Sequence, residues 1–223
     1  MSDIDVITIA AETQTIDMAL ALAGLGLKVF PCTAKKVPLF ASAHPEDDPL
    51  RGKCHGECGK LGHGFYDGTT DPISIMAWPD CAYIGIYCEG SGIFAVDIDV
   101  KNGKDGYASF DAMILEAGGQ PLAIGPIQNT PSGGAHYIFK YPAGLRVPNN
   151  TDVLGVGLDL RSSGYICTGP GYTWQPDHGP DSALTEAPEW LLDLIRAMTE
   201  HKTQQQPEPV QPDDEPIQAG SQP

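Results

Sequence analysis

Two aspartates stand at the end of the apolar run IFAVDID (93–99). Because side chains alternate along a β-strand, a strand here places Asp97 and Asp99 on the same face. Aspartate is uncommon in strands, and two neighbouring carboxylates repel each other unless a cation lies between them. Their hard oxygens suit Mg²⁺ or Mn²⁺, so the pair indicates a divalent-metal site. A solvated strand end with two exposed acids fits the same pattern.

The segment TPSGGAH (130–136) has the composition of a tight turn that leads into a strand. A proline restricts the first part of the turn, and Gly133 and Gly134 let the backbone come close to a ligand. Backbone N–H groups in such a turn can hold phosphate oxygens, and His136 stands where it could donate to an anion. The alternative is an ordinary turn followed by a histidine on the surface or in the core.

A third aspartate, Asp159, lies in the apolar pattern GLDLRSSGY (157–165). Arg161 follows two positions later and so takes the same face of a strand, which makes a simple ion pair one interpretation. Together with the aspartate pair and the glycine turn, Asp159 completes a more specific set. Three carboxylates suit two-metal phosphoryl or nucleotidyl transfer, in which they hold two ions about 4 Å apart beside the attacking and leaving oxygens.

A second kind of metal site is indicated by the polar, glycine-rich sequence HPEDDPLRGKCHGECGKLGH. Cys54, Cys58 and His63 lie within ten residues, and a tetrahedral structural zinc ion needs four such ligands. We expect His44 to be the fourth ligand, because His55 is adjacent to Cys54 and would strain the ligand shell. Bound zinc would explain how a long loop with little apolar content stays folded. Free cysteines in a mobile loop are the alternative.

Hydrophobic periodicity and capping residues predict alternating helices and strands. Helices are predicted at 15–26, 71–78, 107–117 and 189–198, and strands at 27–31, 83–87, 93–99, 135–141 and, on either side of a Ser-Ser-Gly turn, within 157–169. We therefore expect one folded domain over residues 1–200. Residues 201–223 hold many prolines and glutamines and no aromatic residue, which predicts a disordered linker.

The 223-residue chain carries 29 acidic and 13 basic residues, a net charge of −16. This balance disfavours a nucleic-acid binder that works through bulk positive charge, so any contact needs a local patch or bound metal ions. No apolar run is long enough to span a membrane, and the acidic N-terminus lacks the pattern of a secretory signal. We therefore expect a cytoplasmic protein whose cysteines are reduced thiols.

In combination, these motifs resemble the N-terminal bifunctional primase–polymerase domain of the archaeo-eukaryotic primase superfamily, which is common in phage and plasmid replication proteins. The resemblance covers about residues 15–175 and includes FP (30–31), K-x-P (36–38), T-x-D (69–71), IGI (84–86), SGIFAVDID (91–99), TPSGGAH (130–136) and GLDLRSSGY (157–165). It implies that Asp97, Asp99 and Asp159 bind the metal ions. It also implies that the motif Gly134-Ala135-His136 contacts the phosphates of the incoming nucleotide.

The resemblance suggests further phosphate contacts as well. Many members of the superfamily have Ser-x-His in the second motif, whereas a glycine takes the serine position here. Ser132, or a backbone N–H of Gly133 or Gly134, is therefore the expected replacement. Arg161 and Lys36 are additional candidates for phosphate contact.

The implied fold is α+β: an RRM-like antiparallel sheet that carries the acidic triad, a smaller α/β module with a zinc-stabilised loop, and an active cleft between them. The implied activity is that of a nucleotidyltransferase, a template-directed DNA primase/polymerase that makes primers on single-stranded DNA from NTPs or dNTPs with Mg²⁺ or Mn²⁺. The linker would lead to a helicase domain in a longer chain. Two other functions stay open: a non-catalytic origin-binding or helicase-docking module, and a metal-dependent phosphohydrolase, although such hydrolases usually carry more histidines.

Overall fold

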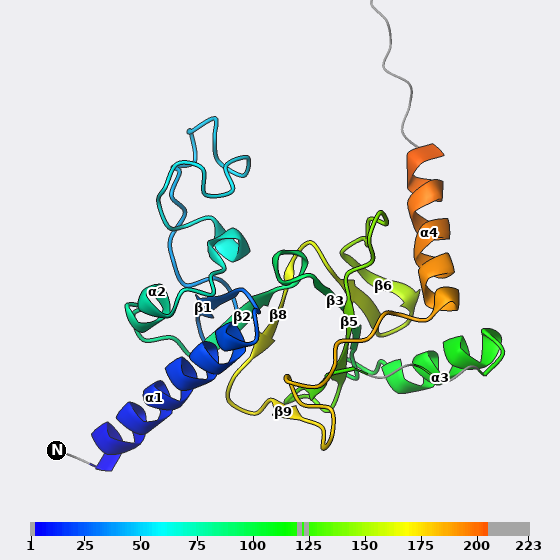
Figure 1. The fold of residues 1–223 in the computed structure, drawn as a ribbon, viewed down its shortest axis with the longest axis horizontal. Coiled ribbons are helices and arrows are strands. Elements are labelled where there is room, and N and C mark those ends of the chain that lie inside the picture. Colours follow the sequence, from blue (N-terminus) through cyan, green and yellow to red (C-terminus); the bar gives the residue numbers. More distant parts are fainter. Residues whose placement is uncertain (1–2, 120–121, 123–124, 205–223) are drawn as a thin grey trace, which may run out of the picture.

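Two antiparallel sheets form the body of the molecule in the computed structural model of the chain (Figure 1). The structure describes residues 3–119, 122 and 125–204, and among these the side chains between residues 14 and 199. The small sheet has the order β1-β2-β8, formed by Val29–Cys32, Tyr83–Tyr87 and Tyr165–Thr168. The large sheet has the order β6-β7-β3-β5-β4-β9, formed by Asn150–Gly155, Leu158–Arg161, Ile93–Ile98, Ala135–Lys140, Ile127–Asn129 and Thr173–Trp174. All pairings between these strands are antiparallel, which confirms the predicted α+β class.

Helices pack against both sheets. The described helices and 3₁₀ turns are α1 (Asp3–Gly24), η1 (Gly64–Asp67), α2 (Pro72–Met76), η2 (Glu89–Ser91), α3 (Gly106–Glu116) and α4 (Glu189–Gln204). Figure 1 shows α1 and α2 beside the small sheet, and α3 and α4 on the opposite side of the large sheet. Asp71 caps α2 as its sequence predicts, because its carboxylate accepts the Ser74 N–H at 2.9 Å. Within the described part of the chain, none of the helices combines the length and apolar character needed to cross a membrane.

Alternate residues of β3 pack into two different cores. Ile93 and Ala95 lie in a core with residues of α1 and the small sheet, whereas Phe94 and Val96 lie in a core with α3 and α4. The large sheet is therefore covered on both faces. Asp97 continues the alternation of Ile93 and Ala95, so its side chain lies on the face toward the small sheet.

The strands predicted on either side of the Ser-Ser-Gly turn are both present, but they do not form a hairpin. β7 joins the large sheet and β8 joins the small sheet. Between them, Ser162 donates from its backbone N–H to Asn149 Oδ1 at 3.1 Å and from its hydroxyl to Val147 O at 2.7 Å. This connection ties the two sheets together directly after Asp159 and Arg161.

Several boundaries differ from the predictions. α1 begins at Asp3, well before the predicted start at residue 15, and α4 continues to Gln204, past the predicted domain boundary at residue 200. β4, β6 and β9 were not predicted, because they are short or polar and show no alternating apolar pattern. Of the predicted linker over residues 201–223, residues 201–204 belong to α4, and residues 205–223 lie outside the described residues.

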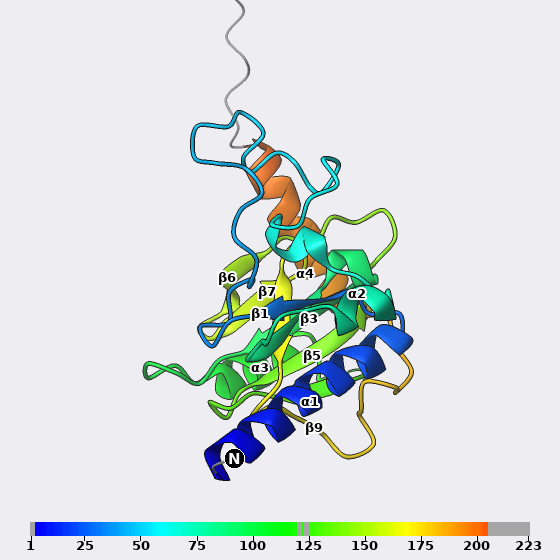
Figure 2. The same ribbon diagram turned by 90° about the vertical axis from the view of Figure 1, so that its left-hand side faces the viewer.

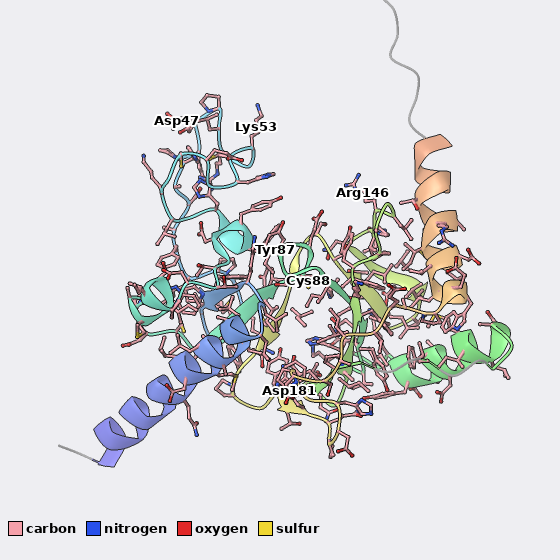
Figure 3. The ribbon with its side chains drawn as sticks, in the orientation of Figure 1. Asp47, Lys53, Tyr87, Cys88, Arg146 and Asp181 are labelled. Atoms are coloured by element: carbon pink, nitrogen blue, oxygen red, sulfur yellow. The ribbon has the colours of Figure 1, made fainter. Side chains whose placement is uncertain are left out.

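An irregular arm, residues 33–63, stands out from the small sheet between β1 and η1 (Figures 1 and 2). Figure 3 shows Asp47 and Lys53 near its tip. The arm contains neither helix nor strand, and all of its residues are described. At Gly62 a Cβ would lie 2.1 Å from the carbonyl oxygen of Ala41, so the arm folds back on itself too closely for any other residue there.

Candidate functional site

Three polar side chains meet in one row across the middle of the large sheet. Asp97 on β3 is the register partner of His136 on β5 and of Asp159 on β7. Because directly opposite residues of antiparallel strands point to the same side, all three side chains lie on the face toward the small sheet. His136 Nε2 is 3.6 Å from Asp97 Oδ1. Motifs that are far apart in the sequence therefore form one cluster.

Arg161 lies between the two strand-borne carboxylates. Its Nε donates to Asp97 Oδ2 at 3.2 Å, and its Nη2 donates to Asp159 Oδ2. The other carboxylate oxygen of Asp159 accepts the backbone N–H of Asp152 at 2.8 Å. The ion pair along β7 is thus present, but the guanidinium also reaches Asp97. Its positive charge offsets the repulsion between the two carboxylates.

Asp99 lies just beyond β3, at the cavity that Asp97 also lines. Its Oδ1 accepts the backbone N–H of Lys101 at 3.1 Å, and Lys101 Nζ is 3.7 Å from the same oxygen. Asp99 is partly exposed and has no contact with Arg161 among the described interactions. It is therefore the most accessible acid of the predicted triad.

A cavity of about 410 Å³ opens between the two sheets in front of these residues. Such a volume is typical of small-molecule sites. Besides the two acids of the DID motif, the wall holds cations, hydroxyls, a histidine and aromatic rings, namely Lys36, Lys101, Arg161, Thr130, Ser132, His136, Phe65, Tyr165 and Tyr172. Groups that can hold metal ions, phosphates and a flat ring therefore occur together in one cavity.

The turn before β5 needs a glycine at position 134. A Cβ at Gly134 would lie 2.0 Å from the carbonyl oxygen of Ile98, so a serine does not fit there. The backbone N–H groups of Gly133 and Gly134 donate to the carbonyl oxygen and Oγ1 of Thr130, at 3.0 and 3.1 Å. Both N–H groups are thus bonded inside the turn, so a phosphate contact from either would compete with these bonds. Thr130 and Ser132 of this turn both line the cavity, with their hydroxyl oxygens 3.0 Å apart.

We expect Gly134→Ser to lower the free energy of unfolding by about 2 kcal/mol, because the added atoms push against the backbone of β3. Gly24→Ser is the matched control, since a Cβ at Gly24 meets nothing within 4 Å. Urea unfolding of the two variants measures the difference. Equal unfolding free energies would contradict the close contact between the turn and β3.

His136 is buried and bonded on its Nδ1 side. Nδ1 lies 3.0 Å from Gln128 Oε1, and Gln128 Nε2 donates to Thr168 Oγ1 at 2.6 Å. Burial lowers the pKa of His136 to about 4, against the opposing effect of Asp97, so the ring is neutral near pH 7. Gln128 and Thr168 belong to no motif, and the sequence analysis missed them.

The lowered pKa of His136 predicts a loss of stability in acid. An unfolded histidine has a pKa of about 6.5, so below that pH the unfolded state binds a proton that the folded state does not bind until about pH 4. Stability is therefore lost as the pH falls through this window. Wild type should lose up to about 3 kcal/mol more than His136→Gln, measured by urea unfolding without added Mg²⁺ or Mn²⁺. Parallel pH curves for the two proteins would refute this.

Lys36 reaches the cavity from the loop after β1. Its Nζ donates to Tyr172 OH at 2.8 Å and lies 4.7 Å from the centre of that ring and 5.1 Å from the centre of the Tyr83 ring. The backbone φ of Lys36 is 61°, which is uncommon for a residue with a side chain, and its carbonyl oxygen accepts the Tyr165 hydroxyl at 3.0 Å. Such strained residues concentrate at functional sites, which agrees with the predicted role of Lys36.

The four predicted zinc ligands come together in the arm. One ligand atom from each lies within 4.8 Å of the others in the set His44, Cys54, Cys58 and His63. Within this set, Cys58 Sγ is 3.4 Å from His63 Nε2. His55, the other histidine of the arm, stacks instead on Tyr66 with ring centroids 3.8 Å apart.

Both histidines of this cluster are oriented by carboxylates. His44 Nδ1 is 2.8 Å from Asp48 Oδ2, while its Nε2 is buried without a hydrogen-bond partner. His63 Nδ1 is 3.5 Å from Asp67 Oδ1. Metal-bound histidines commonly face a carboxylate with their second nitrogen, and a buried nitrogen without a partner is costly. The donor set and these contacts therefore fit a tetrahedral zinc ion.

The chain was compared with curated proteins and with protein-family models. A search of curated proteins found no match to the chain. The family model described as "Bifunctional DNA primase/polymerase, N-terminal" matches residues 19–190. That range is more than half of the chain and contains both sheets, the arm and every residue that lines the cavity. The chain therefore belongs to the bifunctional DNA primase/polymerase N-terminal domain family.

Proposed function

We propose that this chain is a template-directed DNA primase/polymerase of phage or plasmid replication, which makes primers on single-stranded DNA by two-metal nucleotidyl transfer. Family membership implies DNA primase/polymerase activity in general, with DNA and nucleotides as substrates. The observation that carries the finer proposal is the row of Asp159, Asp97 and His136, of which Asp97 and His136 line a cavity of about 410 Å³ and the buried Asp159 lies behind Arg161.

Asp97, Asp99 and Asp159 would hold Mg²⁺ or Mn²⁺. Their carboxylate oxygens are the hard donors that these ions prefer, and Arg161 already places a positive charge between Asp97 and Asp159. Two bound ions would activate the attacking hydroxyl and stabilise the charge that develops on the transferred phosphate. Arg161 would give up at least one carboxylate on metal binding, which frees donors of its guanidinium for a phosphate.

The triphosphate of the incoming nucleotide would lie against groups that line the cavity: the cations Lys36 and Arg161, the Ser132 hydroxyl and the His136 ring. In the reaction, the 3′-hydroxyl of the growing strand attacks the α-phosphorus of an NTP or dNTP. The hydroxyl proton is lost, a phosphodiester bond forms and pyrophosphate leaves. At primer initiation the hydroxyl comes from another nucleotide.

We also assign His44, Cys54, Cys58 and His63 to a structural zinc ion. The arm has no helix or strand of its own, so metal–ligand bonds would take the place of a packed core. Four protein ligands leave no open coordination position, which is typical of structural rather than catalytic zinc sites.

Primer synthesis on single-stranded DNA templates, with labelled nucleotides and Mg²⁺ or Mn²⁺, tests the proposed activity. Template-dependent products that vanish in the Asp97→Ala/Asp99→Ala double variant would support it. A folded, metal-replete protein that makes no product would contradict it and favour a non-catalytic docking module. Release of phosphate from nucleotides without a template would favour a phosphohydrolase.

A further inference from the structure

A buried chain of hydrogen bonds runs from the small sheet to His136. Gln128 on β4 is fully buried, and Thr168 on β8 is 1% exposed. The Gln128 amide bonds to Thr168 Oγ1 at 2.6 Å and to His136 Nδ1 at 3.0 Å. Gln128 is the register partner of His136, whereas Thr168 belongs to the other sheet. The amide therefore spans the junction of the two sheets.

This amide selects one orientation of the imidazole ring. Burying an amide is costly, and Gln128 offsets the cost because both of its polar atoms are bonded. A half-turn of the His136 ring about its bond to Cβ would put a carbon where Nδ1 lies and leave one amide atom without its partner. In the observed orientation, Nε2 is the nitrogen that lies toward Asp97 and the cavity.

The contacts on the other sides of the ring are looser. His136 Nε2 is 3.6 Å from Asp97 Oδ1, beyond hydrogen-bond distance, and the ring centroid is 6.1 Å from that of Tyr172. Neither contact distinguishes one ring orientation from the other as strongly as a 3.0 Å hydrogen bond does. The Nδ1 side, and therefore Gln128, holds the ring in place.

We propose that Gln128 is a positioning residue for nucleotide binding: supported by Thr168, its carbonyl oxygen accepts the Nδ1–H of His136 and so turns Nε2 toward the triphosphate, whose negative charge favours the protonation that lets Nε2 donate to a phosphate oxygen. This inference rests on the proposed function, because it takes His136 to be a phosphate contact. Since the amide is anchored in both sheets, the orientation of His136 also depends on how the small sheet packs against the large one.

Three substitutions in the full chain test this by titration with dATP and Mn²⁺. Gln128→Leu removes the amide, Thr168→Val removes the hydroxyl at nearly constant shape, and Thr168→Ser keeps the hydroxyl. We expect the dissociation constant of dATP to rise about tenfold in Gln128→Leu, about threefold in Thr168→Val and not at all in Thr168→Ser. The turnover of each active variant should change less than its affinity for dATP.

Gln175→Leu is the matched control for loss of an amide. Gln175 Nε2 donates to Asn129 Oδ1 at 3.1 Å, so this amide also bonds to a side chain of the large sheet but does not touch His136. Its loss should leave the dATP dissociation constant unchanged. An equal rise in Gln175→Leu and Gln128→Leu would overturn the proposal, because it would indicate a general loss of packing.

Nitrogen NMR of ¹⁵N-histidine-labelled protein without nucleotide reads the ring directly. Wild type and Thr168→Ser should show a hydrogen-bonded Nδ1 of His136, and Gln128→Leu should lose this signal. An unchanged signal together with an unchanged dissociation constant would mean that Gln128 serves stability alone, and would overturn the proposal. If Gln128→Leu does not fold, the pair Thr168→Val and Thr168→Ser gives the same decision.

Neither readout requires catalysis, so the two proposals can fail separately. A wild type that makes no primers, but whose His136 signal and dATP affinity depend on Gln128, would refute the polymerase proposal and retain the positioning role. An active wild type whose Gln128→Leu variant binds dATP normally would refute the positioning role alone.

Discussion

Replacing Asp97 by asparagine is expected to slow primer extension about 1000-fold, which corresponds to ~4 kcal/mol in the activation free energy. Asparagine keeps the shape of the side chain but removes the charge that would hold a divalent ion. Asp97 has the central place in the row, since it contacts both His136 and Arg161. The fold should survive, because Arg161 keeps its contact with Asp159.

Asp111→Asn is the matched control for loss of one carboxylate. Asp111 is exposed on α3 and does not line the cavity, so this variant should extend primers at the wild-type rate. Extension of a primed single strand with Mn²⁺ measures both variants, and Mn²⁺ titration shows whether Asp97→Asn has lost metal affinity. If Asp97→Asn keeps extension within tenfold of wild type, Asp97 does not hold a catalytic metal ion.

The face on which each aspartate lies could be predicted from the sequence, but its neighbours could not. The alternation of β3 is enough to predict that Asp97 points away from Phe94 and Val96. A period of two does not say which strand pairs with which, or in what register. His136 and Asp159 lie opposite Asp97 only because β3 pairs with β5 and β7, which follow it at a distance in the chain.

Residues that act through burial were the hardest to find. Gln128, in the middle of β4, and Thr168, at the end of β8, look like ordinary polar residues of short strands, and they are buried only because the small sheet packs against the large one. The Ser-Ser-Gly turn also depends on how the two sheets pack. Its local sequence fits a hairpin, whereas the strands that flank it, β7 and β8, belong to different sheets. The four predicted zinc ligands were easier to group, because cysteine and histidine are uncommon and all four lie within one short segment, where the structure brings them together.

If His44, Cys54, Cys58 and His63 bind zinc, then His44 and His55 should differ in their effect on zinc binding. His44→Gln should lower zinc affinity by more than the 10–100-fold typical for loss of a supporting residue, because it removes a ligand. His55→Gln should retain zinc, because His55 stacks on Tyr66 outside the cluster. Elemental analysis and the visible spectrum of the Co²⁺-substituted protein measure both variants. Equal zinc affinity in the two would exclude His44 as a ligand.

Loss of zinc should also change the cavity between the two sheets, because η1 connects the arm to it. His63 directly precedes η1, and Asp67 of η1 accepts the backbone N–H groups of Gly62 and His63 at 2.8 and 3.0 Å. Phe65, in the middle of η1, lines the cavity. In His44→Gln we therefore expect fast hydrogen exchange in the arm, protected amides in β3 and β5, and weaker dATP binding. An arm that stays protected without zinc would be held by its own contacts, and the structural role of the metal would be refuted.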